Sequence, residues 1–195
     1  MLAAVILSGG ASSRMGSPKA LLPYQGRPFL EHLLEVTAHR QIGARRVVLG
    51  ADAEPIGKAV NLKADEVVIN HEWEKGQLSS IQAALRSLPP GTDGILLCLI
   101  DHPLISAALV QDLIEQFYKS KKTIVLPLYE SRRGHPVIFS SALYDELLRA
   151  PLETGARAVV WAHTGEVEEV PTNEEGCVLN LNDPETLNRA FQKDN

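Results

Sequence analysis

The sequence predicts an α/β fold: a single domain over residues 1–195, with a doubly wound, mostly parallel sheet and helices on both of its faces. Apolar runs alternate with segments of helical spacing in units of roughly 30 residues. The runs at 2–7 and 94–100 are apolar throughout, which is typical of parallel strands buried on both faces. A chain of 195 residues is long enough to bury a full core in one domain, and it contains no internal repeat or linker.

Short apolar runs predict the strands of this sheet. The run at 94–100 is the most hydrophobic, so we expect it at the centre of the sheet. Polar residues, glycine or proline border the runs and favour turns there. In chain order the expected strands are 2–7, 45–50, 66–70, 94–100, 123–127, 136–139 and 166–171.

The segments between the runs predict helices. Near the start of 28–41, apolar residues recur at helical spacing, and the segment 76–88 is closed by Pro89-Pro90-Gly91. Asp183 before Pro184 predicts a final helix, because aspartate favours the N-cap and proline the first helical position. In chain order the expected helices are 28–41, 54–62, 76–88, 107–119, 141–149, 154–163 and 184–192.

Composition excludes several classes of protein. A formal net charge of -5 and a pI near 5.7 argue against a nucleic-acid-binding protein, which usually carries a basic face. Cys98 and Cys177 give neither a disulfide framework nor metal-ligand spacing, so we expect a reducing cytoplasm. The apolar N-terminal stretch is short and lacks a basic leader, which argues against a signal peptide and a membrane span.

The loop after the first strand is the strongest functional feature. It reads Leu7-Ser-Gly-Gly-Ala-Ser-Ser-Arg-Met-Gly-Ser-Pro-Lys19, and its glycines let backbone amides approach an anion closely. Arg14 and Lys19 add two positive charges, although the spacing differs from that of the common P-loop. Each glycine alone fits a plain turn, but the ordered combination predicts a loop that holds a nucleoside triphosphate and leaves its α-phosphate open to attack.

Asp101 follows the predicted central strand and is the candidate metal ligand. A carboxylate at such a strand end is placed to hold Mg²⁺ against a triphosphate, because Mg²⁺ needs only one or two protein oxygens. The alternative is a cap or turn residue before Pro103. Asn182 or Asp183 would give a second oxygen ligand, and the alternative for Asp183 is a plain N-cap.

Two further groups have both a binding and a structural interpretation. Arg133 and His135 suit an anionic acceptor, or else form a basic surface turn. Polar residues at the start of the helix at 76–88 either hydrogen-bond to the edge of a nucleotide base or cap the helix. Trp73 either stacks against the base or fills the hydrophobic core. The members of this second group, besides Trp73, are Asn70, Gly76, Gln77, Ser79 and Ser80.

The chain resembles the molybdenum cofactor cytidylyltransferases, with the guanylyltransferases as near relatives. The resemblance covers nearly the whole chain and rests on a series of motifs. These are Gly9-Gly10, Ser13-Arg14-Met15-Gly16, Pro18-Lys19, Leu21-Leu22-Pro23, the segment 70–80, Asp101-His102-Pro103, Arg133-Gly134-His135-Pro136, Gly155-Ala156-Arg157 and Asp183-Pro184-Glu185.

The resemblance implies a Rossmann-like nucleotidyltransferase fold and a set of site residues. The triphosphate loop comprises Leu7, Ser8, Gly9, Gly10, Ser13, Arg14, Gly16 and Lys19, and Asp101 binds Mg²⁺. Two departures concern specificity and the metal. The loop has Leu-Ser-Gly-Gly where the cytidylyl branch tends to have Ala-Ala-Gly, and Asn180 and Asn182 replace two aspartates of the family's C-terminal motif.

The expected reaction is transfer of CMP from CTP to the terminal phosphate of molybdopterin, with release of pyrophosphate. Lys19, Arg14 and Asp101 are the expected catalytic residues; Arg133 and His135 hold the acceptor, and a molybdoenzyme receives the product. GMP transfer from GTP is the alternative within the family. A sugar-phosphate or polyol-phosphate acceptor, and a nucleotide-binding chaperone without turnover, are the alternatives outside it.

Overall fold

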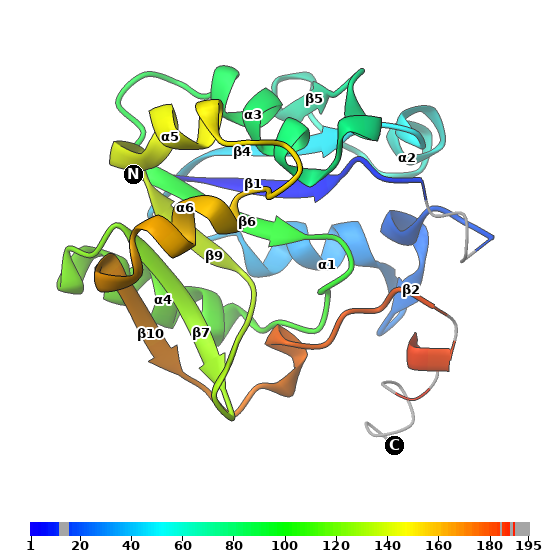
Figure 1. Cartoon of the computed structure of the whole chain (residues 1–195). Helices are drawn as coiled ribbons and strands as arrows, with labels where there is room; N and C mark the ends of the chain where they lie inside the picture. The colour runs from blue at the N-terminus through cyan, green and yellow to red at the C-terminus, as the bar shows by residue number, and fades with distance from the viewer. Residues whose placement is uncertain (12–15, 184, 188, 190–195) are drawn as a thin grey trace.

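An eight-stranded sheet forms the centre of the protein (Figure 1). The computed structural model describes residues 1–11, 16–183, 185–187 and 189. The order of strands across the sheet is β10 (Val167–Pro171), β7 (Ile124–Tyr129), β9 (Val137–Ser140), β6 (Gly94–Leu99), β1 (Leu2–Ser8), β4 (Ile42–Leu49) and β5 (Val67–Ile69), with β8 (Arg132–Arg133) paired to β7. The predicted central strand, now β6, lies beside β1 inside the sheet.

Most strand pairs are parallel, as the sequence predicts. β1 runs parallel to β4 and β6, β4 to β5, and β7 to β10. β9 runs antiparallel between β6 and β7. The reason is the short connection: a parallel neighbour needs a crossover of a dozen or more residues, and only residues 130–136 separate β9 from β7. The chain first reverses at Glu130 and Ser131, whose φ angles of 45° and 66° form the tight turn into β8.

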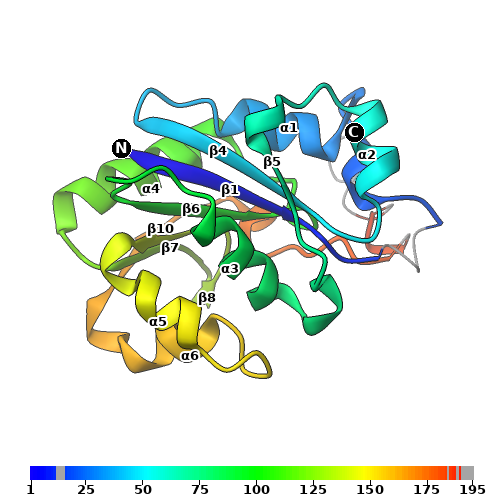
Figure 2. The ribbon, with the colours of Figure 1, turned by 90° about the horizontal axis from the view of Figure 1, so that it is seen from above.

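Helices cover both faces of the sheet, which confirms the doubly wound arrangement (Figure 2). Side chains of α1 (Phe29–Val36), α2 (Ala53–Ala59) and α4 (Ala107–Ser120) pack in the core on one face. Those of α3 (Gln77–Arg86), α5 (Tyr144–Arg149) and α6 (Arg157–Ala162) pack on the other. Successive side chains of β1 alternate between the two cores, since strand residues point to opposite faces in turn. None of the described helices has the length and apolarity needed to cross a membrane.

Several predicted boundaries are wrong. The helix expected at 28–41 ends at Val36, where the Thr37 hydroxyl donates to the Leu33 carbonyl at 2.6 Å; the chain then joins β4 at Ile42. Two features were not predicted: the hairpin of β2 (Pro23–Tyr24) and β3 (Arg27–Pro28), and the short strand β8. The final helix expected at 184–192 falls largely outside the described residues.

Candidate active site

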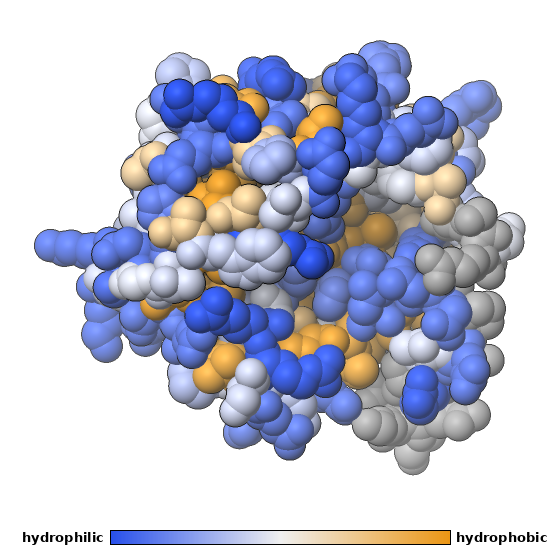
Figure 3. Space-filling view, viewed as in Figure 1, coloured by the Kyte–Doolittle hydropathy of each residue, from blue (hydrophilic) through white to orange (hydrophobic). Residues whose placement is uncertain are grey.

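The carboxyl ends of β1 and β6 open onto a cavity of about 240 Å³, which we call the first cavity. This is the edge of a parallel sheet at which such folds bind ligands. Figure 3 shows a hollow with apolar surface at its bottom, to the right of the centre of that face. The lining residues are Leu7, Ser8, Gly9, Gly10, Ala11, Lys19, Asp52, Ile56, Trp73, Gly76, Gln77, Ser80, Leu99, Ile100 and Asp101. Apart from Gly16, the described residues of the predicted triphosphate loop therefore share this cavity with the predicted metal ligand.

Lys19 connects the N-terminal loop to the C-terminal segment. It begins a short 3-10 turn after Pro18, and its Nζ donates to Asn182 Oδ1. The backbone amide of Leu181 donates to the Asp101 carbonyl at 2.8 Å, which holds this segment against the end of β6. Lys19, Asp101 and Asn182 are far apart in the sequence, but the fold brings them together at one strand end.

The oxygen donors at this strand end fit a hard divalent cation. Asp101 offers a carboxylate, and the Asn182 amide oxygen keeps a second lone pair beside the one that Lys19 occupies. Within the described residues no group of three His, Cys, Asp or Glu side chains is arranged to hold a metal. A cation here would take its remaining ligands from phosphate oxygens and water, as Mg²⁺ commonly does.

Asp183 has the structural role that the sequence left as its alternative. Its Oδ1 accepts the Thr186 amide at 2.8 Å, and its Oδ2 accepts the Thr186 hydroxyl at 3.1 Å. These hydrogen bonds hold the pKa of Asp183 below its ordinary value. The side chain is therefore an N-cap in this structure.

Asn70 organises the loop that leads into α3. Its Nδ2 donates to Ser79 Oγ at 2.9 Å and to Ser80 Oγ at 3.0 Å, and its Oδ1 accepts the Glu72 amide at 2.9 Å. Ser79 Oγ in turn donates to the Gly76 carbonyl at 2.7 Å. Asn70 and Ser79 are buried behind the first cavity, whereas Gly76 and Ser80 line it. Of the predicted nucleotide contacts, Asn70 and Ser79 are thus placed to hold the loop, not to face the cavity.

Close packing at Gly50 fixes the wall of the first cavity. A Cβ at Gly50 would lie 2.2 Å from the Gly9 carbonyl oxygen and 2.7 Å from Trp73 Cβ. The same carbonyl accepts the Ala51 amide at 3.1 Å, and a Cβ at Gly9 would lie 2.9 Å from Ser80 Oγ. Gly50 was not predicted as a site residue, because its role comes from Trp73 packing over it and not from a motif.

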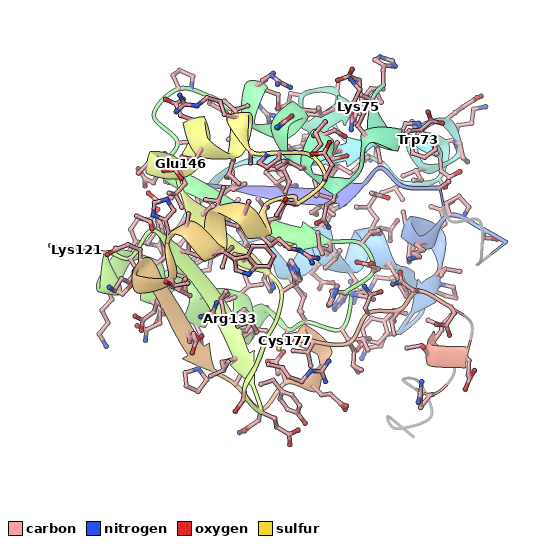
Figure 4. The ribbon with its side chains drawn as sticks, viewed as in Figure 1. Trp73, Lys75, Lys121, Arg133, Glu146 and Cys177 are labelled. Atoms are coloured by element: carbon pink, nitrogen blue, oxygen red, sulfur yellow. The ribbon has the colours of Figure 1, made fainter. Side chains whose placement is uncertain are left out.

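A second cavity of about 530 Å³ adjoins the first, and Gln77 lines both. Figure 4 shows Arg133 well away from Trp73, which lines the first cavity. The residues lining the second cavity are Gln77, Leu78, Leu97, Leu126, Arg133, Gly134, His135, Val137, Phe139, Leu152, Glu153, Thr154, Gly155, Ala156, Arg157, Val160 and Trp161. The two predicted acceptor residues, Arg133 and His135, therefore share this cavity.

Neither predicted acceptor residue presents a free charge. Arg133 Nε donates to Glu169 Oε1 at 2.7 Å. Burial, together with the nearby His102 ring 5.0 Å away between centroids, lowers the pKa of His135 to about 3. The His135 Nδ1 is buried and has no hydrogen-bond partner in the described part of the chain. His135 is thus neutral at pH 7 and available as a hydrogen-bonding group.

His102, next to Asp101, is buried as well. Desolvation lowers its pKa, although the Asp101 charge and the Cys177 backbone oppose this shift. The Cys177 carbonyl also accepts the His135 amide at 2.8 Å, so one backbone segment supports both histidines. Figure 4 shows Cys177 close to Arg133.

Of the remaining three residues of the predicted triphosphate loop, the structure describes only Gly16. Gly16 is exposed with φ of +67°, a conformation that favours glycine, and it does not line the first cavity. Ser13 and Arg14 lie outside the described residues, so their contacts stay predictions.

Comparison with known proteins identifies the family. Residues 4–167 match the family model of the MobA-like NTP transferase domain. Nicotine blue oxidoreductase of Paenarthrobacter nicotinovorans is 33% identical over 147 residues, which is 71% of each chain. A molybdenum cofactor guanylyltransferase of Xanthomonas euvesicatoria pv. vesicatoria is 34% identical over 110 residues, which is 56% of this chain and about half, 52%, of that relative.

Solved structures agree with this match. The crystal structure of Rv0371c from Mycobacterium tuberculosis H37Rv aligns with a TM-score of 0.80 at 30% identity, covering 98% of this chain and 99% of that one. A structure of Rv0371c in complex with manganese aligns with a TM-score of 0.75 at 26% identity, covering 98% of each chain. By its sequence match and its fold, the chain belongs to the MobA-like NTP transferase domain family and is a nucleotidyltransferase.

Proposed function

We propose that the enzyme transfers CMP from CTP to the terminal phosphate of molybdopterin and releases pyrophosphate. The observation that carries the proposal is the pair of adjoining cavities that meet at Gln77. The first has Lys19 and Asp101 in its wall and suits a triphosphate. The second is larger and combines an apolar wall with polar and charged side chains, which suits an acceptor whose phosphate points toward Gln77.

The residues of the first cavity match the needs of phosphoryl chemistry. An oxygen of the acceptor phosphate attacks the α-phosphorus, and the bond from that phosphorus to the α–β bridging oxygen breaks. The electron pair of this bond leaves with pyrophosphate. A phosphate monoester is largely ionised at pH 7, because its second pKa lies near about 6, so no strong general base is needed. The Lys19 ammonium stabilises the charge that develops on the phosphate oxygens.

We also propose that Mg²⁺ is the metal. Asp101 and Asn182 would hold it against the triphosphate, where it would neutralise charge on the phosphate oxygens. The manganese complex of Rv0371c supports a divalent metal in this family. The proposal includes a cytoplasmic location and a molybdoenzyme that receives the product.

The choice of CTP rests on the resemblance to the cytidylyltransferases. The segment Gly134-His135-Pro136 and the pattern of Asn70, Trp73, Gly76 and Ser80 are typical of that branch. The Xanthomonas guanylyltransferase supports the alternative, GMP transfer from GTP to the same acceptor. A sugar-phosphate or polyol-phosphate acceptor is the other alternative.

The test is metal-dependent pyrophosphate release with CTP, molybdenum cofactor and Mg²⁺. We expect EDTA to abolish release and Asp101→Ala to lower kcat by about 10²–10³-fold, the effect of losing one well-placed electrostatic partner. Asp93→Asn is the matched control, because Asp93 precedes the opposite end of β6 and pairs with the N-terminal ammonium at 2.6 Å. Equal turnover in the Asp101 and Asp93 variants would contradict the metal assignment.

A further inference from the structure

The segment from Leu152 to Trp161 forms one side of the second cavity and contains residues that the assigned functions do not use. Gly155, with φ of +73°, turns the chain just before α6. In α6 the residues that line the cavity are Arg157, Val160 and Trp161, whereas Val159 is buried in the core. Arg157 and Trp161 are four residues apart and therefore share a face of the helix. Both side chains thus border the cavity side by side.

Trp161 is exposed, although Val159 in the same helix faces the hydrophobic core. Its exposed fraction is 62%, against 3% for Val159 two residues earlier. An indole ring usually buries a large apolar area, so a tryptophan left open at a cavity offers a flat surface for a ligand. Leu152, 36% exposed, adds apolar surface at the same cavity.

One wall of the second cavity is apolar, while polar and charged side chains line the rest of it. Leu78, Leu97, Leu126, Val137 and Phe139 form this wall with hydrocarbon side chains. This apolar wall offers contact area to the face of a flat conjugated ring. A volume of about 530 Å³ lies within the range of small-molecule sites.

Arg157 is the better placed of the two arginines for an anion. Arg133 is already paired with Glu169. Among the described residues, no acidic side chain lies within ion-pair distance of Arg157, although Glu153 also lines the cavity. An exposed guanidinium without an acidic partner can form a bidentate pair with a phosphate.

From this arrangement we propose that Trp161 and Arg157 select the acceptor: the indole stacks on a flat conjugated ring, and the guanidinium binds the phosphate carried by that ring's side chain. The phosphate then lies between the ring and Gln77, where the two cavities meet. This inference rests on the proposed function, because it takes the second cavity as the acceptor site. It assigns the acceptor to the phosphates that carry a flat ring, and the choice between these and sugar phosphates is an outcome of the test below.

The test measures binding of two probes, neopterin monophosphate and ribose 5-phosphate, by calorimetry. We expect Trp161→Ala to raise the Kd of neopterin monophosphate about tenfold, from the loss of stacking and apolar contact, while Trp161→Phe keeps most of the affinity. Arg157→Ala should raise the same Kd about tenfold, and Arg157→Lys less. The Kd of CTP should not change in any of these variants, which also shows that they fold.

Ile69→Ala is the matched control, because Ile69 is an exposed apolar residue on β5 and lines neither cavity. Unchanged affinity for neopterin monophosphate in Trp161→Ala, no binding of that probe at all, or preferential binding of ribose 5-phosphate would each overturn the inference.

Turnover separates this inference from the proposed function. With molybdenum cofactor as acceptor, Trp161→Ala should raise the KM for the acceptor and leave kcat and the KM for CTP nearly unchanged. If the wild type releases no pyrophosphate with this acceptor but binds neopterin monophosphate through Trp161, the proposed reaction fails and the ring site stands. If Trp161→Ala keeps the wild-type acceptor KM, the ring site fails and the reaction stands.

Discussion

Gly50→Ala is the sharpest test of how the first cavity is built. The new Cβ would lie 2.2 Å from the Gly9 carbonyl oxygen and 2.7 Å from Trp73 Cβ, and neither atom is the end of a flexible side chain. Restoring a contact of about 3.2 Å requires the Gly9 carbonyl to move by about 1 Å, which would also strain its hydrogen bond with the Ala51 amide. Overpacking of this kind costs about 1–3 kcal/mol of folding stability.

The functional effect should exceed the loss of stability. A displacement of about 1 Å in a residue that positions substrate lowers turnover by about 10²-fold, so kcat/KM for the nucleotide should fall by this amount. Steady-state pyrophosphate release measures that quantity, calorimetry gives the Kd of CTP, and urea unfolding gives the stability. Gly57→Ala in α2 is the control, because its Cβ meets no atom within 4 Å and alanine favours a helix by about 0.5–1 kcal/mol. Wild-type nucleotide affinity and turnover in Gly50→Ala would refute this account of the wall.

Three other variants test separate parts of the structure. Lys19→Ala should lower kcat by about 10²–10³-fold with little change in the melting temperature, and near-normal turnover would remove Lys19 from the mechanism. Asn70→Ala leaves the two serine hydroxyls and the Glu72 amide without their partner, so unfolding in urea should show a loss of about 1–3 kcal/mol, together with weaker CTP binding. Burial raises the pKa of Glu66, but hydrogen bonds from Arg45 and the Lys63 amide outweigh burial and lower it below 4.5. Glu66→Gln should therefore lower the free energy of unfolding by about 2 kcal/mol at pH 7. The difference from the wild type should shrink as the pH falls through this lowered pKa, and a difference that does not change with pH would contradict the pairing.

Much of the fold could be predicted from local sequence patterns. The buried parallel strands β1 and β6 are continuous apolar runs, which few other elements produce. The antiparallel direction of β9 was not predicted, because it depends on a short connection whose turn contains no glycine. The end of α1 was placed too late, since Thr37 closes the helix through a side-chain bond to Leu33 that the apolar pattern does not reveal.

The candidate site could be predicted only where motifs carry it. Lys19 and Asp101 were expected to meet because both follow strands that end at the same edge, and they line one cavity. Residues whose importance is a matter of packing or exposure, such as Gly50 and Trp161, have no local pattern that marks them. The neutral state of His135 could likewise not be predicted from the sequence, because it follows from burial beside His102.

The most direct test of the central claim is pyrophosphate release from CTP, GTP, ATP and UTP, each measured with Mg²⁺ in the presence and absence of molybdenum cofactor. The account predicts release from CTP that depends on the cofactor and little release from the other three nucleotides. Cofactor-dependent release from GTP would move the enzyme to the guanylyl alternative. Absence of cofactor-dependent release from all four nucleotides would contradict the claim that this protein transfers a nucleotide to molybdopterin.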